Sequence, residues 1–136
     1  MKEKTFCLIK PDAFERNIVG KILDIIEAHG FQFVAMRFLH LSETEAEQFY
    51  IIHKDKDFYH GLCKYMSEGP VLCMVLEKEN AIADLRKLMG VTDPDKAEKG
   101  TIRNEFGIDI RHNSIHGSDS PESVKREITF FFKGVI

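Results

Sequence analysis

The run Val71-Leu72-Cys73-Met74-Val75-Leu76 is continuously apolar and predicts a β-strand. Gly69-Pro70 directly precedes it and predicts a turn. The segment that follows has apolar residues at helical spacing: Ile82, Leu85 and Met89. We expect Asn80 to cap this helix and Gly90 to end it. The centre of the chain is therefore a strand joined to a helix.

On the N-terminal side of this run, strands and helices alternate again. Thr5 to Lys10 predicts a first strand that Pro11 stops, because proline disfavours continued pairing. The next segment has isoleucines at helical spacing: Ile18, Ile22, Ile25 and Ile26. Gly30 is expected just past the end of that helix. Phe31 to Leu41 is rich in aromatic and branched residues and predicts a long second strand.

Two helices are expected before the central strand. Ser42 and Glu45 have the spacing of a capping box, which predicts a helix that continues to about Ile52. A second, short helix is expected after Asp57, with its apolar residues four apart: Phe58, Leu62 and Met66.

The C-terminal third contains a long polar stretch. Residues 91–113 include Pro94, Gly100 and Gly107 and lack a clear period, so we expect a loop, and a loop of this length usually has a function. Ile115-His116 predicts the end of a short strand. Ser120-Pro121 predicts the start of a last helix, because proline suits the first helical position.

This order of elements predicts an α+β fold. We expect an antiparallel sheet of the ferredoxin-like type with helices on one face, together with the long loop over about 91–113. The chain has 136 residues, of which 43% are hydrophobic and 30% charged, which favours a single domain over residues 1–136.

Composition excludes several classes of function. The net charge of −3 gives no general attraction to nucleic acid, so nucleic acid is not indicated as a partner. The apolar run Phe6-Cys7-Leu8-Ile9 is too short for a signal peptide or a membrane span, which predicts a cytoplasmic protein without membrane contact. Cys7, Cys63 and Cys73 lie in or beside apolar segments, and their odd number favours buried, reduced thiols.

His116 is the first candidate for chemistry. Neither a Walker loop nor a G-x-G-x-x-G motif is present, but His116 lies between a strand end and a helix start, where an anion is favoured. Imidazole is nucleophilic near neutral pH if a partner holds one nitrogen. Glu127 flanks the apolar stripe of the last helix and should have a buried partner. Spacing alone favours the plainer interpretation, in which Glu127 faces solvent and His116 is structural.

A metal site formed by His112 and His116 is a second interpretation. Two histidines four residues apart share one face of a helix, but the alternation of Ile108, Asp109 and Ile110 indicates extended chain. Four residues of a strand span about 13 Å, too far for one zinc ion. We therefore set a structural metal aside.

The segment from Asn113 to Ser120 reads N-S-I-H-G-S-D-S and closely resembles the signature N-x-x-H-G-S-D-S of nucleoside diphosphate kinases. The resemblance covers nearly the whole chain. Further segments match the family in order: Ile9-Lys10-Pro11-Asp12, Lys64-Tyr65-Met66 with Gly69-Pro70, Thr92-Asp93-Pro94 and Gly100-Thr101-Ile102-Arg103. Two departures are His112 and Pro121, where other residues are common in the family.

The resemblance implies a role for each matching residue. His116 would attack the terminal phosphate and Glu127 would orient its ring; the catalytic group as a whole would be His116, Glu127, Lys10, Tyr50 and Ser118. The residues lining the phosphate and ribose pocket would be Lys10, Tyr50, Arg86, Thr92, Arg103 and Asn113. Phe58 and Leu62, with Ile110 opposite, would enclose the base. Taken singly, each of these residues has an ordinary structural explanation.

The resemblance also implies partners and a cofactor. The substrates would be ATP and other nucleoside di- and triphosphates, handled through a phosphohistidine in a ping-pong reaction with broad base specificity. Mg²⁺ would arrive on the nucleotide phosphates, without direct protein ligands. The chain would form a homo-oligomer, either a tetramer or a hexamer.

Two other functions compete with this one. A noncatalytic ferredoxin-like domain that binds nucleotides or a protein would not need a nucleophile, an orienting carboxylate and cations together. A histidine-dependent phosphatase would pass the phosphate to water, and it would have no use for a base slot at Phe58 and Leu62.

Overall fold

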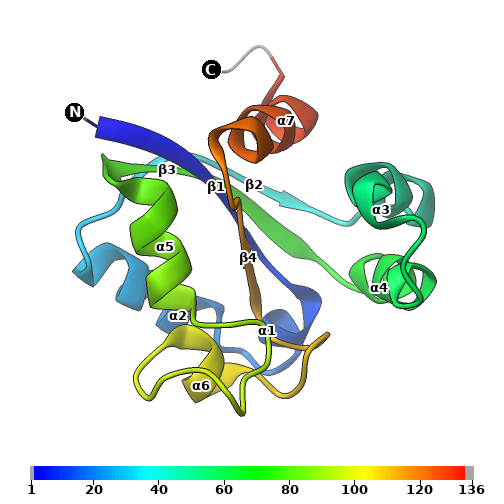
Figure 1. Cartoon of the computed structure of the whole chain (residues 1–136), viewed down its shortest axis with the longest axis horizontal. Helices are drawn as coiled ribbons and strands as arrows, with labels where there is room; N and C mark the ends of the chain where they lie inside the picture. The colour runs from blue at the N-terminus through cyan, green and yellow to red at the C-terminus, as the bar shows by residue number, and fades with distance from the viewer. Residues whose placement is uncertain (1, 134–136) are drawn as a thin grey trace.

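Strands and helices alternate along the chain (Figure 1). The computed structural model describes residues 2–133. In chain order the elements are β1 (Lys2–Ile9), α1 (Pro11–Glu15), α2 (Val19–Ala28), β2 (Gln32–Leu39), α3 (Glu43–Phe49), the 3-10 turn η1 (Ile51–His53), α4 (Tyr59–Met66), β3 (Val71–Glu79), α5 (Ala81–Met89), α6 (Ile102–Phe106), β4 (Ile115–Gly117) and α7 (Pro121–Phe132).

The four strands form one antiparallel sheet in the order β2-β3-β1-β4. The apolar run that predicted β3 is fully buried from Val71 to Leu76, and the strand continues to Glu79. β1 begins at Lys2, earlier than expected, and pairs with β3 along its whole length. The prediction of an α+β antiparallel sheet with helices packed on it is confirmed.

Helices cover both faces of the sheet, so the expectation of helices on one face is wrong. In Figure 1, α5 and α2 lie on one side of β1, and α3, α4 and α7 lie on the other. Phe6 and Leu8 belong to the core cluster shared with α3, α4 and α7, whereas Cys7 and Ile9 belong to the cluster shared with α2 and α5. Successive side chains of a strand point to opposite faces. Both faces of β1 are apolar, so both need cover.

The helix starts confirm two predictions and correct a third. Ser42 and Glu45 form a capping box at α3, and Ser120 caps α7 with Pro121 as its first residue. Asn80 does not cap α5 with its side chain; it has a left-handed backbone, with φ of 55°. The carboxylate of Glu3 on β1 instead accepts a hydrogen bond from the backbone N–H of Ile82, at 2.9 Å. This acceptor lies 79 residues away in sequence, so helical spacing gave no sign of it.

Short helices account for the remaining boundaries. The expected loop over 91–113 contains α6, which Thr101 caps by accepting from the backbone N–H of Asn104. Pro11 ends β1 as predicted but also begins α1. The helix expected to reach about Ile52 ends at Phe49, and the separate 3-10 turn η1 follows it.

Two expectations from the composition concern the cysteines and the apolar segments. Cys7, Cys63 and Cys73 are buried and unpaired, as predicted. Within residues 2–133, no helix combines the length and the apolar character that crossing a membrane requires.

Candidate active site

A cavity of about 660 Å³ opens where the end of β1, the segment from α3 to α4, the loop after α6 and the start of α7 meet. This size suits a small organic ligand. Eleven of the predicted site residues line it: Lys10, Tyr50, Phe58, Leu62, Arg86, Thr92, Arg103, Ile110, Asn113, His116 and Glu127. The twelfth, Ser118, is buried beneath it and contacts Glu127.

His116 is placed by the register of a short strand. On β4 it lies opposite Leu8 of β1, and its side chain points to the face covered by α7. Its neighbour Gly117 lets α5 approach closely, since a Cβ there would be 2.6 Å from Sδ of Met89. The side chain of His116 is 22% exposed, so one edge of the ring is accessible.

Glu127 holds one nitrogen of this ring. His116 Nε2 donates to Oε1 of Glu127 at 2.9 Å, and Ser118 Oγ donates to the same oxygen at 2.6 Å. Because Nε2 carries the proton in this bond, Nδ1 of His116 keeps its lone pair. The prediction that Glu127 has a buried partner is confirmed, and the interpretation in which it faces solvent is wrong.

Several contacts keep the Glu127 carboxylate ionised. Burial raises its pKa, but the hydrogen bond and charge of His116, the hydroxyl of Ser118 and the charge of Arg126 outweigh burial, so the pKa of Glu127 lies below its ordinary value. Arg126 Nη2 lies 3.2 Å from Oε2. Glu127 is therefore a buried anion that fixes the tautomer of His116.

Two arginines donate to the backbone carbonyls on either side of His116. Arg103 is buried and donates to the backbone oxygens of Gly90 and Ile115, at 3.0 and 2.7 Å, which leaves its Nε without a partner among the described residues. Burial first, and then the charge of Arg86, lower the pKa of Arg103 to about 10. Arg86 is exposed and donates to the carbonyl of Gly117 at 3.1 Å. Two positive groups thus lie beside His116.

Lys10 is the third cation of the cavity. It lies just past the end of β1 and donates from Nζ to Oδ1 of Asn113 at 2.7 Å. The amide of Asn113 in turn donates to the backbone oxygens of Thr92 and Ile110, at 3.0 and 3.2 Å. Burial first, and then the charge of Arg103, lower the pKa of Lys10 to about 7. This ammonium therefore lacks an anionic partner strong enough to offset its burial.

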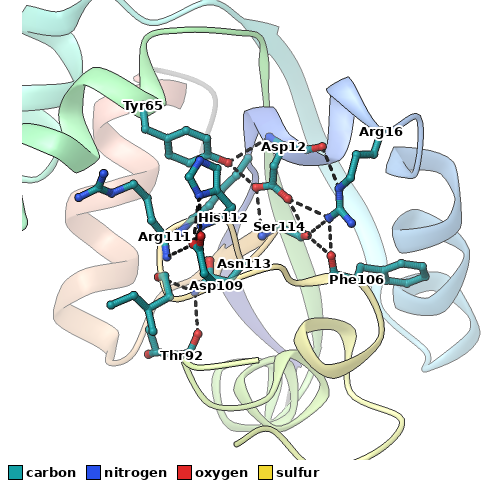
Figure 2. Close-up of polar contacts among 12 residues, drawn as sticks. Asp12, Arg16, Tyr65, Thr92, Phe106, Asp109, Arg111, His112, Asn113 and Ser114 are labelled. Atoms are coloured by element: carbon teal, nitrogen blue, oxygen red, sulfur yellow. Dashed lines mark hydrogen bonds and ion pairs between the residues drawn. The ribbon is translucent and has the colours of Figure 1, made fainter. Parts of the chain in front are cut away.

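A polar cluster centred on the buried carboxylate of Asp12 fixes the segments that carry Lys10 and Asn113 (Figure 2). This Asp12 cluster comprises Asp12, Arg16, Tyr65 and Ser114. Ser114 Oγ and Arg16 Nη2 donate to Oδ2 of Asp12 at 2.9 and 3.1 Å, and the hydroxyl of Tyr65 donates to its Oδ1. Ser114 has φ of 75°, and its carbonyl accepts from the N–H of Lys10 at 2.9 Å. The cluster joins α1 to the loop before β4.

An apolar slot forms the outer part of the cavity. We define it by Phe58 and Leu62 on one side and Ile110 on the other. Phe58 is 45% exposed and Ile110 is 64% exposed, which is unusual for large apolar side chains that do no more than fill a core.

Sequence reasoning missed other residues of the cavity wall, among them His53, Asp109, Arg111 and Arg126. None belongs to a local pattern that indicates a site. Asp119, which also lines the cavity, lies within the matched signature and could have been found there.

The described residues contain no group of three or more His, Cys, Asp or Glu side chains that could hold a metal ion. His112 and His116 take part in separate contacts, since His112 Nδ1 faces Asp109 at 3.0 Å and His116 faces Glu127.

The fold and the cavity define a class of protein. An imidazole with one nitrogen held and one free, three cations in the same cavity and an apolar slot in its outer part make up the site of an enzyme that transfers phosphate. The sequence model of the family described as nucleoside diphosphate kinase matches residues 3–135.

Named relatives agree over nearly the full length. The chain is 57% identical over 130 residues to a nucleoside diphosphate kinase from Geotalea uraniireducens, covering 96% of this chain and 95% of the relative. It is 52% identical over 130 residues to one from Persephonella marina, covering 96% and 93%.

Solved structures match just as closely. The nucleoside diphosphate kinase of Aquifex aeolicus superimposes with a TM-score of 0.96 at 42% identity, covering 99% of this chain and 98% of the other. That of Halobacterium salinarum, solved in complex with CDP, gives 0.93 at 40% identity, covering 98% and 89%. The chain belongs to the nucleoside diphosphate kinase family, and its activity is the transfer of the terminal phosphate of a nucleoside triphosphate to a nucleoside diphosphate.

Proposed function

We propose that Nδ1 of His116 is the atom that accepts the phosphate. The observation that carries this proposal is the bond from Nε2 to Glu127, which leaves Nδ1 with a free lone pair beside the cavity. A bond from Nδ1 to the γ-phosphorus forms as the bond from that phosphorus to the bridging oxygen breaks, and a nucleoside diphosphate leaves. A second nucleoside diphosphate takes the phosphate by the reverse step, which gives ping-pong kinetics.

The cationic residues and the residues that bind the sugar position the substrate. Arg86 and Arg103 neutralise the charge on the transferring phosphate, and the hydroxyl of Thr92 donates to it. Lys10 and Asn113 hold the ribose and the inner phosphates, supported by their mutual bond at 2.7 Å. The buried hydroxyl of Tyr50 has no partner among the described residues and is available as a further hydrogen-bond donor to the substrate.

Glu127 and Ser118 are positioning residues. They act on the reaction through the ring of His116, because Glu127 accepts from Nε2 and Ser118 accompanies that carboxylate. As the ring gains positive charge during attack, the carboxylate stabilises it.

We propose Mg²⁺ as the divalent cation of a nucleotide kinase, bound to the substrate phosphates. When bound it neutralises charge on those phosphates. The composition of the cavity supports this, since the described residues lack a cluster of metal ligands while Lys10, Arg86 and Arg103 remain for the phosphates themselves.

The apolar slot is proposed to take the base of either a purine or a pyrimidine nucleotide. Its three side chains stack on or cover any base, because every base has a π face. Discrimination should stay below about 10⁴-fold, the level that requires hydrogen-bonded recognition deep in a site. Comparing kcat/KM for ADP, GDP, CDP, UDP and dTDP with one donor tests this.

We further propose that residues 1–136 form one domain, that the chain assembles as a tetramer or hexamer, and that it works in the cytoplasm. Exposed apolar residues on β2 support assembly: Val34, Met36 and Phe38. Three unpaired thiols suit a reducing compartment. Sedimentation of the purified protein tests the assembly.

The deciding experiment is phosphoenzyme formation. Incubation with γ-labelled ATP and Mg²⁺ should give an acid-labile, base-stable label that discharges to added GDP. His116→Ala should bind nucleotide but carry no label, and His60→Ala, which removes an exposed histidine outside the cavity, should be labelled normally.

A label on His116→Ala would move the chemistry to another residue, such as His53 on the same wall. The ring of His53 has no hydrogen bond within residues 2–133 to hold it. Label that appears only as free phosphate would make the protein a phosphatase instead.

A further inference from the structure

Arg111 lies on the cavity wall in a position that the reaction above does not use. It follows Ile110, and its guanidinium lies directly over Gly61 of α4. A Cβ on Gly61 would be 2.4 Å from Nη2 and 2.7 Å from Cζ of Arg111. A side chain at position 61 would displace the guanidinium from this place.

The backbone of Arg111 is fixed, but its charge has no partner. Oδ1 of Asp109 accepts from the backbone N–H groups of Arg111 and His112, at 2.9 and 2.7 Å. Among residues 2–133, no carboxylate or carbonyl accepts a hydrogen bond from the guanidinium. Figure 2 shows this side chain pointing away from the Asp12 cluster. Its donors are consequently free for a ligand.

The placement of the guanidinium joins the two walls of the apolar slot. Gly61 of α4 lies in sequence between Phe58, the residue that precedes this helix, and Leu62, and Arg111 is the next residue after Ile110. A base that enters between these walls presents its faces to the apolar side chains. It therefore meets the guanidinium with its edge.

We propose that Arg111 is a specificity-determining residue that contacts the edge of the base, and this rests on the apolar slot being the base site as proposed above. A guanidinium has donors and no acceptor. Guanine and hypoxanthine present a carbonyl oxygen where adenine presents an amino group, and uracil does so where cytosine presents one. Arg111 thus favours keto bases over amino bases, within a site that still accepts all of them.

Inosine diphosphate and ADP are the sharpest pair of probes. They differ at the purine 6-position, where one has a carbonyl and the other an amino group. We expect the ratio of kcat/KM for inosine diphosphate to that for ADP, with one fixed donor, to be about tenfold, the low end for a bidentate contact because Arg111 is partly exposed. In Arg111→Ala the ratio should fall to near one.

Three further variants separate the contact from a general effect of charge. Arg111→Lys keeps the charge but loses the planar fork, so most of the preference should disappear. Gly61→Ala displaces the far end of the Arg111 side chain without removing it, and it should lower the ratio as well. Lys21→Ala removes one positive charge from an exposed site on α2 and should leave the ratio unchanged.

Two outcomes would overturn the proposal. One is a wild-type ratio near one. The other is an Arg111→Ala enzyme that loses the same factor for both acceptors, which would make Arg111 a support for the loop and not a contact to the base. Failure of the proposed reaction is distinct from both, because it appears as a wild-type protein without label on His116.

Discussion

The Asp12 cluster, which holds the segments of Lys10 and Asn113 behind the cavity, and the apolar slot, which lines it, differ in burial and in bonding. Asp12 is 3% exposed and Ser114 is fully buried, and their polar atoms are bonded to one another and to Arg16. Phe58 and Ile110 are 45% and 64% exposed and have no such constraint. The segments that carry Lys10 and Asn113, which we propose hold phosphate and sugar, are preorganised, and the slot that we propose takes the base is open. A fixed geometry for the reacting groups and tolerance of different bases would therefore come from different parts of the cavity.

Buried polar residues should be the sensitive ones, and the largest effect is expected at Glu127, which is 3% exposed. Glu127→Ala removes the acceptor of His116 Nε2, so phosphate transfer should slow by about 10²–10⁴-fold, as is typical for lost acid–base or orienting groups. Glu127→Gln keeps an acceptor and should lose less. Stopped-flow measurement of phosphoenzyme formation gives both rates.

Glu122→Ala is the matched control, since Glu122 is an exposed glutamate in the first turn of the same helix. If Glu127→Ala and Glu127→Gln both keep wild-type rates, the buried pair does not contribute to transfer.

Substitutions in the Asp12 cluster should lower the free energy of unfolding more than substitutions in the apolar slot. Asp12→Ala leaves Tyr65 and Ser114 without their acceptor, and we expect a loss of about 3 kcal/mol in the free energy of unfolding, the upper end for buried groups left unpaired. Ile110→Ala, at the exposed end, should change it by less than about 0.5 kcal/mol. Urea unfolding of the two variants compares them directly, and equal losses would show that the Asp12 cluster stabilises the fold no more than the apolar slot does.

The protonation of Lys10 should make nucleotide binding depend on pH. Its pKa of about 7 means that it is largely neutral above that pH. Bound phosphate favours the ammonium and raises this pKa, so binding above pH 7 should take up a proton. The Kd for ADP should therefore rise with pH above 7, by at most about tenfold per unit, and should not respond to this group well below 7.

Calorimetry at pH 8 in two buffers of different ionisation enthalpy measures the proton uptake. In Lys10→Arg the cation keeps its charge throughout this range, so uptake should vanish. Wild-type protein that takes up no proton at pH 8 would contradict the lowered pKa.

The smallest effect is expected in the apolar slot. Phe58→Ala should raise KM by about fivefold for every nucleotide and leave their order nearly unchanged, because an exposed ring contributes at the low end of base stacking. Steady-state assays with the five diphosphates measure it. A variant whose order of preference is rearranged would mean that Phe58 selects bases and does not simply cover them.

Prediction from the sequence succeeded where the cause is local. The apolar run of β3, the capping box at Ser42 and the proline at the start of α7 are decided by neighbours in the chain, and all three are confirmed. It failed where the partner is distant. Glu3 replaced Asn80 as the cap of α5, and the second covered face of the sheet depended on where α2 and α5 pack.

The candidate site divides in the same way. Its twelve predicted residues came from the family resemblance, with His116 and Glu127 also proposed from the residues alone, and eleven of the twelve line the cavity. Asp12 was part of a matched motif, yet its contacts with Tyr65 and Ser114 span 53 and 102 residues, so no spacing rule could have indicated them. Arg111 and Gly61 were likewise unmarked, because their fit depends on two segments meeting.

By itself, the sequence determined the kinds of element, their order and the chemical groups available to the site, because these depend on side-chain type and on near neighbours. Only the tertiary structure decided which nitrogen of His116 is held, which cations are desolvated and where a free guanidinium lies. Those properties depend on distance, burial and direction between groups far apart in the chain, and they are fixed when β4, α7 and the loop after α6 pack against β1.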